Sequence, residues 1–426
     1  MQHKLIPIIF ISLFSIISTV TGQKLVNSPY SRFNLGTYEP AGSFKSLGMG
    51  GIGVAMRDNN SIYLSNPASY SSLDTNSFLF DFGIDYGQNY LSDGVSNYSS
   101  DDVNFDHLMV GFPISKGWGF AAGIVPLTNG YYKLAETVLE GDPDYDPITG
   151  EYSSYHGGEG GFSNFFLGSG IRINKYLSAG VNMRLLLGQV IRTNQFDFTD
   201  YYYTFNNNST EKIQLGGINF DYGLQYTASL KNDYFFNAGV SVNSGKYYKT
   251  KYEHIAFRYT AYNTQDTISY VANDSSRAYI PGTLKLGISF GKKDKFTTGI
   301  DFTYTKWSNS KIPGSDGYAA DTKSILFGAE YIPEKFSNYS YFKRLEYRIG
   351  GHVADNYLII NGEQIKEFGG SIGLGIPMRR LSKINMYFDL TRKSGSITNG
   401  LHSENYYTFG LSLNLYDFWF IKRKYD

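Results

Sequence analysis

The sequence predicts an all-β fold, a transmembrane antiparallel β-barrel of about 14 strands. Three observations lead to this prediction. The composition combines many glycines and aromatic residues, apolar residues alternate with polar ones along the chain, and the connections between the predicted strands alternate between short and long. A soluble β-sandwich would share the first two observations but not the third.

The composition is typical of a β-protein and excludes several classes of partner and site. The 426 residues include 47 Gly, 38 Tyr and 31 Phe but only 12 Pro. Aromatic residues favour strands, and glycine favours turns. The 38 basic and 38 acidic residues balance, so no net charge argues for a nucleic-acid partner. The absence of cysteine excludes disulfides, thiolate metal sites and a lipidated N-terminal cysteine.

Residues 1–22 are predicted to be a secretory signal peptide. Lys4 precedes an apolar run over residues 5–18, and Val20-Thr21-Gly22 supplies the small residues of a cleavage site. The apolar run is shorter than the ~20 residues that a spanning helix needs. We therefore expect the mature chain to leave the cytoplasm.

The rest of the chain alternates between apolar and polar residues with a period of two. Ile384, Met386, Phe388 and Leu390 share one face of a predicted strand, and the intervening polar side chains share the other. This periodicity indicates strands, not helices. The same pattern recurs in residues 177–187, 218–226, 236–243, 284–290 and 407–415.

The lengths of the connections favour a membrane barrel over a sandwich. Connections after even-numbered strands are mostly tight, such as Lys116-Gly117, whereas those after odd-numbered strands include the long polar segments 135–160 and 248–277. Short periplasmic turns and long outer loops produce this alternation in the outer membrane, and an even strand number places both termini in the periplasm. The predicted strands are 77–91, 103–115, 117–134, 161–174, 176–195, 212–230, 233–247, 278–291, 295–307, 323–332, 344–355, 365–377, 383–393 and 405–416.

Residues 23–76 precede the first strand and are too long for a simple tail. We expect them to form an N-terminal plug, or hatch, in the lumen of a barrel formed by residues 77–426. The predicted lumen-facing charges are mixed in sign, and some are expected to pair with one another or with the plug. They are Asp81, Asp85, Arg172, Arg184, Asp221, Lys285, Asp301, Glu330, Glu346, Arg348 and Asp389.

A glycine-rich stretch of the predicted plug matches the pattern G-x-G-x-x-G at Gly48, Gly50 and Gly53. A dinucleotide site needs this pattern between a buried strand and a helix. No hydrophobic strand precedes it, and the polar residues 57–60 would end any helix that follows, so we expect no nucleotide cofactor. Together with Gly51, these glycines are instead expected to let the backbone approach the barrel wall closely.

The order of motifs over residues 28–70 resembles the FadL-type outer-membrane family. The run from Gly48 to Ala55 and the triplet Asn66-Pro67-Ala68 stand between a signal peptide and a long series of strands. In that family the triplet is a signature of the hatch, so the resemblance implies a barrel of about 14 strands with an N-terminal hatch. The two ends of the mature chain resemble members from Bacteroidetes-type bacteria, related in kind to the PorV-like barrels.

The resemblance also implies a route for hydrophobic small molecules such as long-chain fatty acids. They would be captured outside, enter a pocket in the lumen and leave sideways where the third strand is kinked. Val125 and Pro126 mark a candidate kink, because a proline inside a strand cannot donate a ladder hydrogen bond. The alternative interpretation of Pro126 is an ordinary strand end near the outer rim.

No residue pattern indicates an enzyme. The six histidines are scattered without metal-ligand spacing, and no nucleophile motif lies at a strand-to-helix turn. The acid-rich residues 141–152 do not match a calcium loop. We therefore expect no catalytic residue, no metal and no cofactor, with a Ser, His and Asp cluster formed only in three dimensions as the alternative.

Two functions from different classes remain compatible with the sequence. The leading hypothesis is a FadL-like barrel that binds hydrophobic small molecules and passes them by diffusion through a hatch-plugged lumen. The second is a non-transporting subunit of a larger outer-membrane machine, for β-barrel assembly or type 9 protein secretion, that contacts other outer-membrane or lipoprotein subunits. Outer-membrane lipid surrounds the barrel in both. Tyrosine-rich segments such as residues 201–203 suit either ligand capture or a protein interface.

Overall fold

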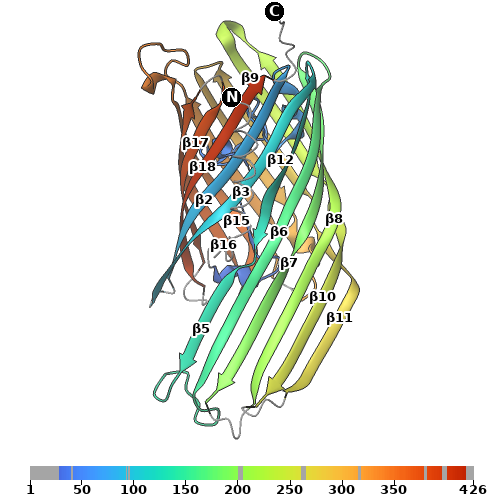
Figure 1. Cartoon of the computed structure of the whole chain (residues 1–426), viewed down its shortest axis with the longest axis vertical. Helices are drawn as coiled ribbons and strands as arrows, with labels where there is room; N and C mark the ends of the chain where they lie inside the picture. The colour runs from blue at the N-terminus through green and yellow to red at the C-terminus, as the bar shows by residue number, and fades with distance from the viewer. Residues whose placement is uncertain are drawn as a thin grey trace, which may run out of the picture.

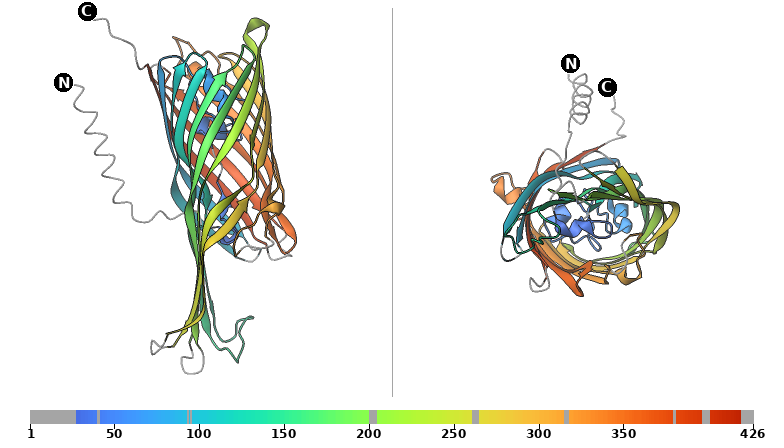
Figure 2. Two further views of the ribbon diagram at one scale, coloured as in Figure 1. Left: turned by 90° about the vertical axis from the view of Figure 1, so that its right-hand side faces the viewer. Right: turned by 90° about the horizontal axis from the view of Figure 1, so that it is seen from below.

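Antiparallel strands form a barrel around residues 28–39 and 42–76 (Figure 2). The computed structural model describes residues 28–39, 42–92, 94, 96–199, 205–260, 265–314, 318–378, 381–395 and 401–418. The predicted signal peptide lies outside these ranges. Within them, no helix is long and apolar enough to cross a membrane.

The barrel wall is a closed antiparallel sheet of 14 strands, which confirms the predicted fold class. β18 pairs with β2 and closes the sheet (Figure 1). The wall strands are β2 (Ser77–Ser92), β3 (Asn97–Ser115), β4 (Trp118–Asn129) with β5 (Tyr132–Val138), β6 (Tyr152–Arg172), β7 (Leu177–Phe198), β8 (Asn206–Ser229), β9 (Tyr234–Asn243) with β10 (Lys246–Tyr259), β11 (Gln265–Ile280) with β12 (Thr283–Lys292), β13 (Phe296–Thr305), β14 (Thr322–Tyr331), β15 (Glu346–Ile360), β16 (Glu363–Pro377), β17 (Lys383–Ser394) and β18 (Ser403–Phe418).

Three wall strands are interrupted and therefore carry two labels each. β8 pairs with β9 along one half and with β10 along the other, and β6 pairs in the same way with β4 and β5. The sequence predicts these strands as continuous, and this is wrong at each break. A Cβ at Gly282 would come within 2.7 Å of the amide nitrogen of Gly245, so the two backbones approach closely at this break, which glycine permits.

The outward face of the wall carries an apolar band. On β18, Phe409, Leu411, Leu413 and Leu415 are 37–41% exposed, whereas the intervening Ser412 is buried against the interior. Apolar side chains that face outward from a closed barrel are typical of a wall surrounded by lipid. The period-two pattern in the sequence thus has its apolar face on the outside.

The long polar segments predicted as outer loops are largely strands, so that prediction is wrong. β5, the start of β6, β10 and β11 cover much of residues 135–160 and 248–277. Together with β7 and β8 they project beyond the rest of the barrel as a narrow sheet, the extension (Figures 1 and 2). Most residues of β11 from 265 to 273 are exposed, so this strand has no buried face to impose an alternating pattern.

The two ends of the barrel differ. The short-turn end carries the connections around residues 116–117, 173–176 and 293–295, and the extended end carries the extension. The helical turns η4 (Lys231–Asp233) and η6 (Phe342–Arg344) lie in connections of the short-turn end, and η5 (Trp307–Asn309) follows β13 at the other. That the termini face the periplasm stays a prediction.

Residues 28–39 and 42–76, the inner segment, lie inside the barrel (Figure 2). η2 (Pro29–Arg32) and β1 (Thr37–Tyr38) lie toward the extended end, and α2 (Phe44–Leu47) and η3 (Pro67–Ser72) lie toward the short-turn end. Nearly all residues from 43 to 71 are buried or half-buried. The predicted role of this segment as a hatch, and the domain division at residue 76, stay predictions.

Candidate functional site

A belt of glycines on the inner wall contacts the inner segment. Thirteen of the 14 wall strands, all except β17, contribute at least one glycine whose missing Cβ would collide with or press on residues 44–70. On β17 the corresponding place is taken by Tyr387, whose ring lies 4.7 Å from that of Phe44. The belt consists of Gly83, Gly111, Gly119, Gly170, Gly180, Gly223, Gly239, Gly287, Gly299, Gly328, Gly350, Gly373 and Gly410.

The glycine-rich stretch of the inner segment meets this belt directly. A Cβ at Gly48 would lie 3.0 Å from the Cα of Gly373. Gly50 and Gly51 have φ angles of 69° and 88°, a backbone conformation that favours glycine. A side chain on Gly50 would also meet the wall backbone at Gly351, 2.6 Å away. The backbones therefore touch without intervening side chains.

Gly53 turns the inner segment toward β13. Its amide donates a hydrogen bond of 2.7 Å to the carboxylate of Asp301, and the next amide, of Val54, donates another of 2.8 Å. A Cβ at Gly53 would lie 3.0 Å from the hydroxyl of Ser65. One wall carboxylate thus satisfies two consecutive backbone donors that would otherwise be buried without partners.

The triplet Asn66-Pro67-Ala68 begins the helical turn η3 and ties it to the wall. The Asn66 side chain accepts a hydrogen bond from the amide of Ala68 at 3.1 Å, as an N-cap residue does. Its amide group donates to the carbonyl of Val54 at 2.9 Å and to that of Leu224 on β8 at 3.1 Å. Asparagine at this position therefore joins two turns of the inner segment and the barrel.

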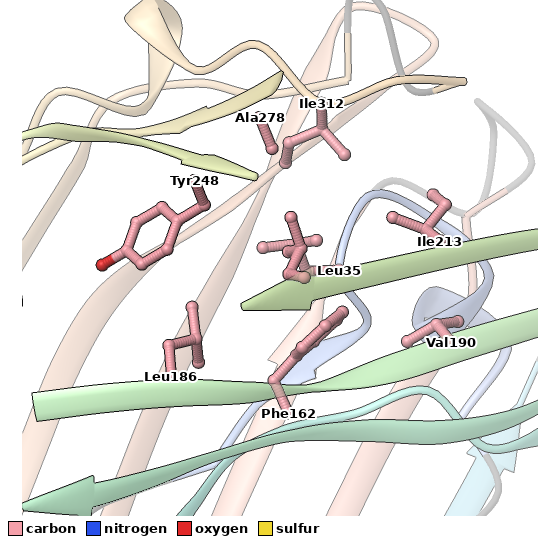
Figure 3. Packing of buried hydrophobic residues seen from close by; sticks show 9 residues of the cluster. Leu35, Phe162, Leu186, Val190, Ile213, Tyr248, Ala278 and Ile312 are labelled. Atoms are coloured by element: carbon pink, nitrogen blue, oxygen red, sulfur yellow. The ribbon is translucent and has the colours of Figure 1, made fainter. Parts of the chain in front are cut away.

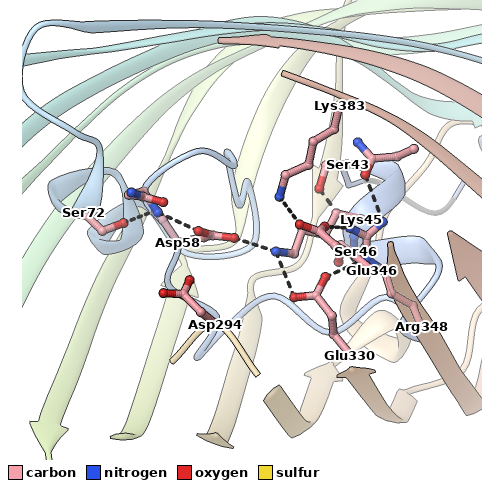
Figure 4. A network of polar contacts seen from close by, with 12 residues as sticks. Ser43, Lys45, Ser46, Asp58, Ser72, Asp294, Glu330, Glu346, Arg348 and Lys383 are labelled. Atoms are coloured by element: carbon pink, nitrogen blue, oxygen red, sulfur yellow. Dashed lines mark hydrogen bonds and ion pairs between the residues drawn. The ribbon is translucent and has the colours of Figure 1, made fainter. Parts of the chain in front are cut away.

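A lysine of α2 is the centre of a buried charged network (Figure 4). The ammonium of Lys45 lies 2.5 Å from Asp58 of the inner segment and 3.2 Å from Glu330 of β14. Burial alone would raise the pKa of Asp58, but the positive charges of Lys45 and Lys383 outweigh it and hold this pKa well below its usual range. The network thus fastens the inner segment to the wall with paired charges.

The charged wall residues of this network also form ion pairs with one another. The guanidinium of Arg348 lies 2.7 Å from Glu330 and also contacts Glu346. Lys383 of β17 lies 2.5 Å from Glu346. As the sequence predicts, lumen-facing charges pair with one another and with the inner segment, which partly compensates the cost of their burial.

Near the extended end, apolar side chains fix the start of the inner segment. Leu35 is fully buried between Phe162, Ile213 and Tyr248 of three wall strands (Figure 3). The hydroxyl of Tyr30 donates a hydrogen bond of 2.5 Å to the carbonyl of His402. The inner segment therefore contacts the wall at both ends of the barrel.

A cavity of about 340 Å³ lies between these two contact regions. Apolar groups such as Leu47, Val54 and Leu326 line part of it, but carboxylates outnumber the basic groups. Burial raises the pKa of one of them, Glu39. The acidic lining residues are Glu39, Asp85, Asp106, Asp301, Glu367 and Asp389, and the basic ones are Lys285, His352 and Lys393.

The wall has a seam at the candidate kink. Pairing of β3 with β4 ends at Leu108 and Ile124, directly before Val125 and Pro126. The ladder between β4 and β6 has an irregularity immediately after Pro126. Val125 is buried, with 1% of its surface exposed. Whether the seam is a lateral opening stays a prediction.

Residues of the inner segment cover this seam from inside. β1 pairs with the end of β4, Tyr38 opposite Thr128, where β3 no longer does. The amide of Glu39 adds a hydrogen bond of 3.0 Å to the carbonyl of Leu127. Short-range sequence patterns do not reveal this pairing, because the partners are some ninety residues apart in the sequence.

A model of the BamG family matches residues 1–426. The chain belongs to the BamG family. No curated protein matches the chain. Among the described residues of this BamG-family barrel, no group of three His, Asp, Glu or Cys side chains is arranged to hold a metal ion.

Solved structures share the fold of the BamG-family barrel at low sequence identity. The CymD monoaromatic hydrocarbon channel is 15% identical with a TM-score of 0.55, covering 90% of this chain and 98% of that one. A Pseudomonas aeruginosa FadL homologue is 11% identical with a TM-score of 0.57, covering 90% and 99%. The Ralstonia pickettii toluene transporter TbuX is 12% identical with a TM-score of 0.53, covering 88% and 98%.

These comparisons confirm the predicted resemblance to FadL-type barrels at the level of fold. CymD is described as a hydrocarbon channel and TbuX as a toluene transporter. The predicted relation to Bacteroidetes-type members and to PorV-like barrels stays a prediction.

Proposed function

We propose that this BamG-family chain is an outer-membrane barrel that serves as a sealed, non-transporting subunit of a larger protein machine for β-barrel assembly or protein secretion. One observation carries the proposal. The inner segment contacts glycines on 13 of the 14 wall strands, all except β17. No side of the segment is therefore free to slide along the wall. Outer-membrane lipid, and other outer-membrane or lipoprotein subunits, are the partners that this function implies.

Displacing the inner segment would be costly. It would break the two hydrogen bonds to Asp301, those of Asn66 and the buried ion pair of Lys45 with Glu330 at the same time. Each buried polar group left without a partner costs about 1–3 kcal/mol. Several such losses exceed what a weakly bound small ligand could supply, which argues against a hatch that opens for each passing molecule.

The cavity lining also disfavours a long acyl chain. Sites for apolar ligands are lined mainly by hydrophobic side chains with few polar groups. Here Asp85, Asp106 and Glu39 lie on the lining, and Asp389 and Glu367 add further carboxylates. A fatty acid would add a further carboxyl group to a lining in which acidic residues already outnumber basic ones.

The extension supplies a surface for a partner protein. Within the described residues, β11 pairs with β10 alone from Gln265 to Ala272, and β5 pairs with β6 alone from Leu134 to Val138. Unpaired strand edges offer backbone donors and acceptors to an extended segment of another chain. Ile268 and Tyr270 of β11 are 60% and 62% exposed, which adds apolar area beside that edge.

Passive passage of hydrophobic small molecules is the second candidate. The seam at Pro126 and the hydrocarbon channels that share the fold favour it. The ligand would be small, because the cavity measures about 340 Å³, and neutral, because the lining offers few basic groups to pair with an anion. Long-chain fatty acids, the predicted substrates, are less suited to that chamber.

A native pull-down combined with an uptake assay tests the proposal. The tagged chain should co-purify with outer-membrane or lipoprotein subunits, and its deletion should leave uptake of long-chain lipophiles unchanged. Purification of the chain alone, together with slower uptake in the deletion strain, would instead support transport.

A shortened extension sharpens this test. Tyr252 and Asn273 lie directly opposite each other, so residues 253–272 can be replaced by an Asn-Gly turn without a change of register. The proposal expects this variant to lose partners while it still folds. The matched control shortens the hairpin between Tyr90 and Ser99, which are also opposite each other, and should keep its partners.

A further inference from the structure

Four cations gather on the outer surface at the base of the extension. They are Lys249 and Lys251 of β10, Arg277 of β11 and Lys311 of the connection after β13, and together they form the outer basic patch. All four are exposed. Among the side chains that the structure describes, no carboxylate lies within ion-pair distance of any of them, whereas Arg258 farther out pairs with Asp266 at 2.8 Å.

Strand geometry directs these side chains outward. Tyr248 of β10 and Ala278 of β11 belong to the apolar cluster around Leu35 inside the barrel. Neighbouring residues of a strand point to opposite faces, so Lys249 and Arg277 point away from the lumen. Lys311 forms a bridge opposite Tyr279 and therefore shares the outward side of that residue.

The patch lies at the edge of the apolar band. On β8 the outward side chains from Tyr226 through Leu224 to Ile218 are apolar or aromatic and 40–54% exposed. The next outward position is Gly216, and Lys249 lies directly opposite it. The cations therefore begin where the hydrocarbon-facing surface ends, at the level of lipid headgroups.

The arrangement of the patch favours a bound anion. Lys249 and Arg277 lie directly opposite each other on neighbouring strands, and like charges in that position destabilise a sheet. Glu253 is the nearest acidic residue along β10, but it lies opposite Lys212 of β8. An anion from outside the protein would remove the repulsion that no described side chain relieves.

We propose that the outer basic patch binds the phosphate groups of anionic lipid headgroups at the surface of the membrane. Arginine and lysine bind phosphate through charge-assisted hydrogen bonds. The rings of Tyr247 and Tyr279, 4.8 Å apart, lie beside the cations and suit the boundary between acyl chains and headgroups. This site is separate from the inner segment and does not depend on which function the barrel serves.

Native mass spectrometry of the full chain in detergent tests the site with two lipids. The probe is diphosphorylated lipid A, and zwitterionic phosphatidylcholine is the comparison. A variant with Lys249→Gln, Lys251→Gln, Arg277→Gln and Lys311→Gln is expected to bind lipid A at least tenfold more weakly, since each charge near a membrane surface is worth roughly fivefold in affinity. Binding of phosphatidylcholine is expected to stay the same.

The matched control removes four exposed lysines at the short-turn end, through Lys116→Gln, Lys175→Gln, Lys231→Gln and Lys293→Gln. It should change lipid A binding less than twofold. Heat-dependent gel mobility verifies that both variants form barrels. The site is refuted if the patch variant binds lipid A as the wild type does, or loses both lipids equally. Binding of inorganic phosphate as tight as that of lipid A would overturn the lipid assignment.

Discussion

The carboxylate of Asp301 on β13 accepts a hydrogen bond of 2.7 Å from the backbone amide of Gly53 in the inner segment. This contact links the middle of the glycine-rich stretch to the barrel wall. The match to the dinucleotide-binding pattern therefore has another cause, because the anion that meets these amides is a side chain of the protein itself.

Gly350→Ala is expected to loosen the inner segment. A Cβ there would press against the backbone of Met49 and Gly50. Overpacking of this kind costs about 1–3 kcal/mol, so the variant should unfold at lower denaturant concentration and expose residues 42–76 to protease. Gly370→Ala is the matched control, because its Cβ would lie 3.8 Å from the nearest atom. Equal protease resistance of both variants would show that the close contacts of the glycine belt do not hold the inner segment in place.

Arg348→Met should destabilise the barrel strongly. It would leave Glu330 and Glu346 buried without their shared partner, at a cost of about 3–5 kcal/mol. Denaturant unfolding measures the change in free energy. Lys335→Met removes a more exposed pair with Asp294 and should cost at most about 1 kcal/mol. Comparable losses in the two variants would show that the network does not hold the inner segment.

Acid is expected to release the inner segment through Asp58. The folded-state pKa of this carboxyl lies below its usual value, so its contribution to stability is present above the unfolded pKa of about 4 and is lost as the pH falls below that value. Limited acid proteolysis should therefore cut residues 42–76 only below about pH 4. Asp58→Asn should be cut more readily at neutral pH, with a weaker pH dependence. Cleavage that begins near neutral pH in the wild type would exclude Asp58 as the cause.

Leu411→Arg tests the lipid-facing surface. Leu411 is 41% exposed in the apolar band of β18, and an arginine near the midplane of a membrane costs about 2–4 kcal/mol. Folding into lipid vesicles should fail or slow, as followed by gel mobility. Tyr339→Arg changes a fully exposed residue in a connection and should fold normally. Normal folding of Leu411→Arg would place that strand face outside the lipid.

The sequence alone is sufficient to predict the wall but not the extension. The strands of the wall separate lipid from an interior, so residues such as Leu411 and Ser412 alternate and the number of strands is predictable. Strands that meet water on both sides have no such constraint. The sequence therefore predicts a loop in place of β10 and β11, although Lys249 to Tyr259 pair continuously with β8.

The candidate site is predictable only in part. Local sequence indicates that Gly48 and Gly50 need close contact with a neighbour, and Asn66 stands out as a helix cap before Pro67. The other half of each contact is set by strand register. Strand pairings between residues far apart in the chain decide which wall glycine faces Gly50. Such pairings also place β1 over the seam at Val125.

A disulfide that locks the inner segment distinguishes a sealed barrel from one whose inner segment moves. The hydroxyl of Ser289 on β12 donates a hydrogen bond of 2.9 Å to the carbonyl of Ala55, and the chain has no cysteine of its own. Ala55→Cys combined with Ser289→Cys places the only two cysteines of the chain at this contact, and the reduced protein serves as the control for the oxidised one. A sealed subunit predicts that the oxidised variant co-purifies with the same partners as the reduced one and supports growth equally. Loss of partners, or of lipophile uptake, on oxidation alone would show that the inner segment must move and that the barrel is not sealed.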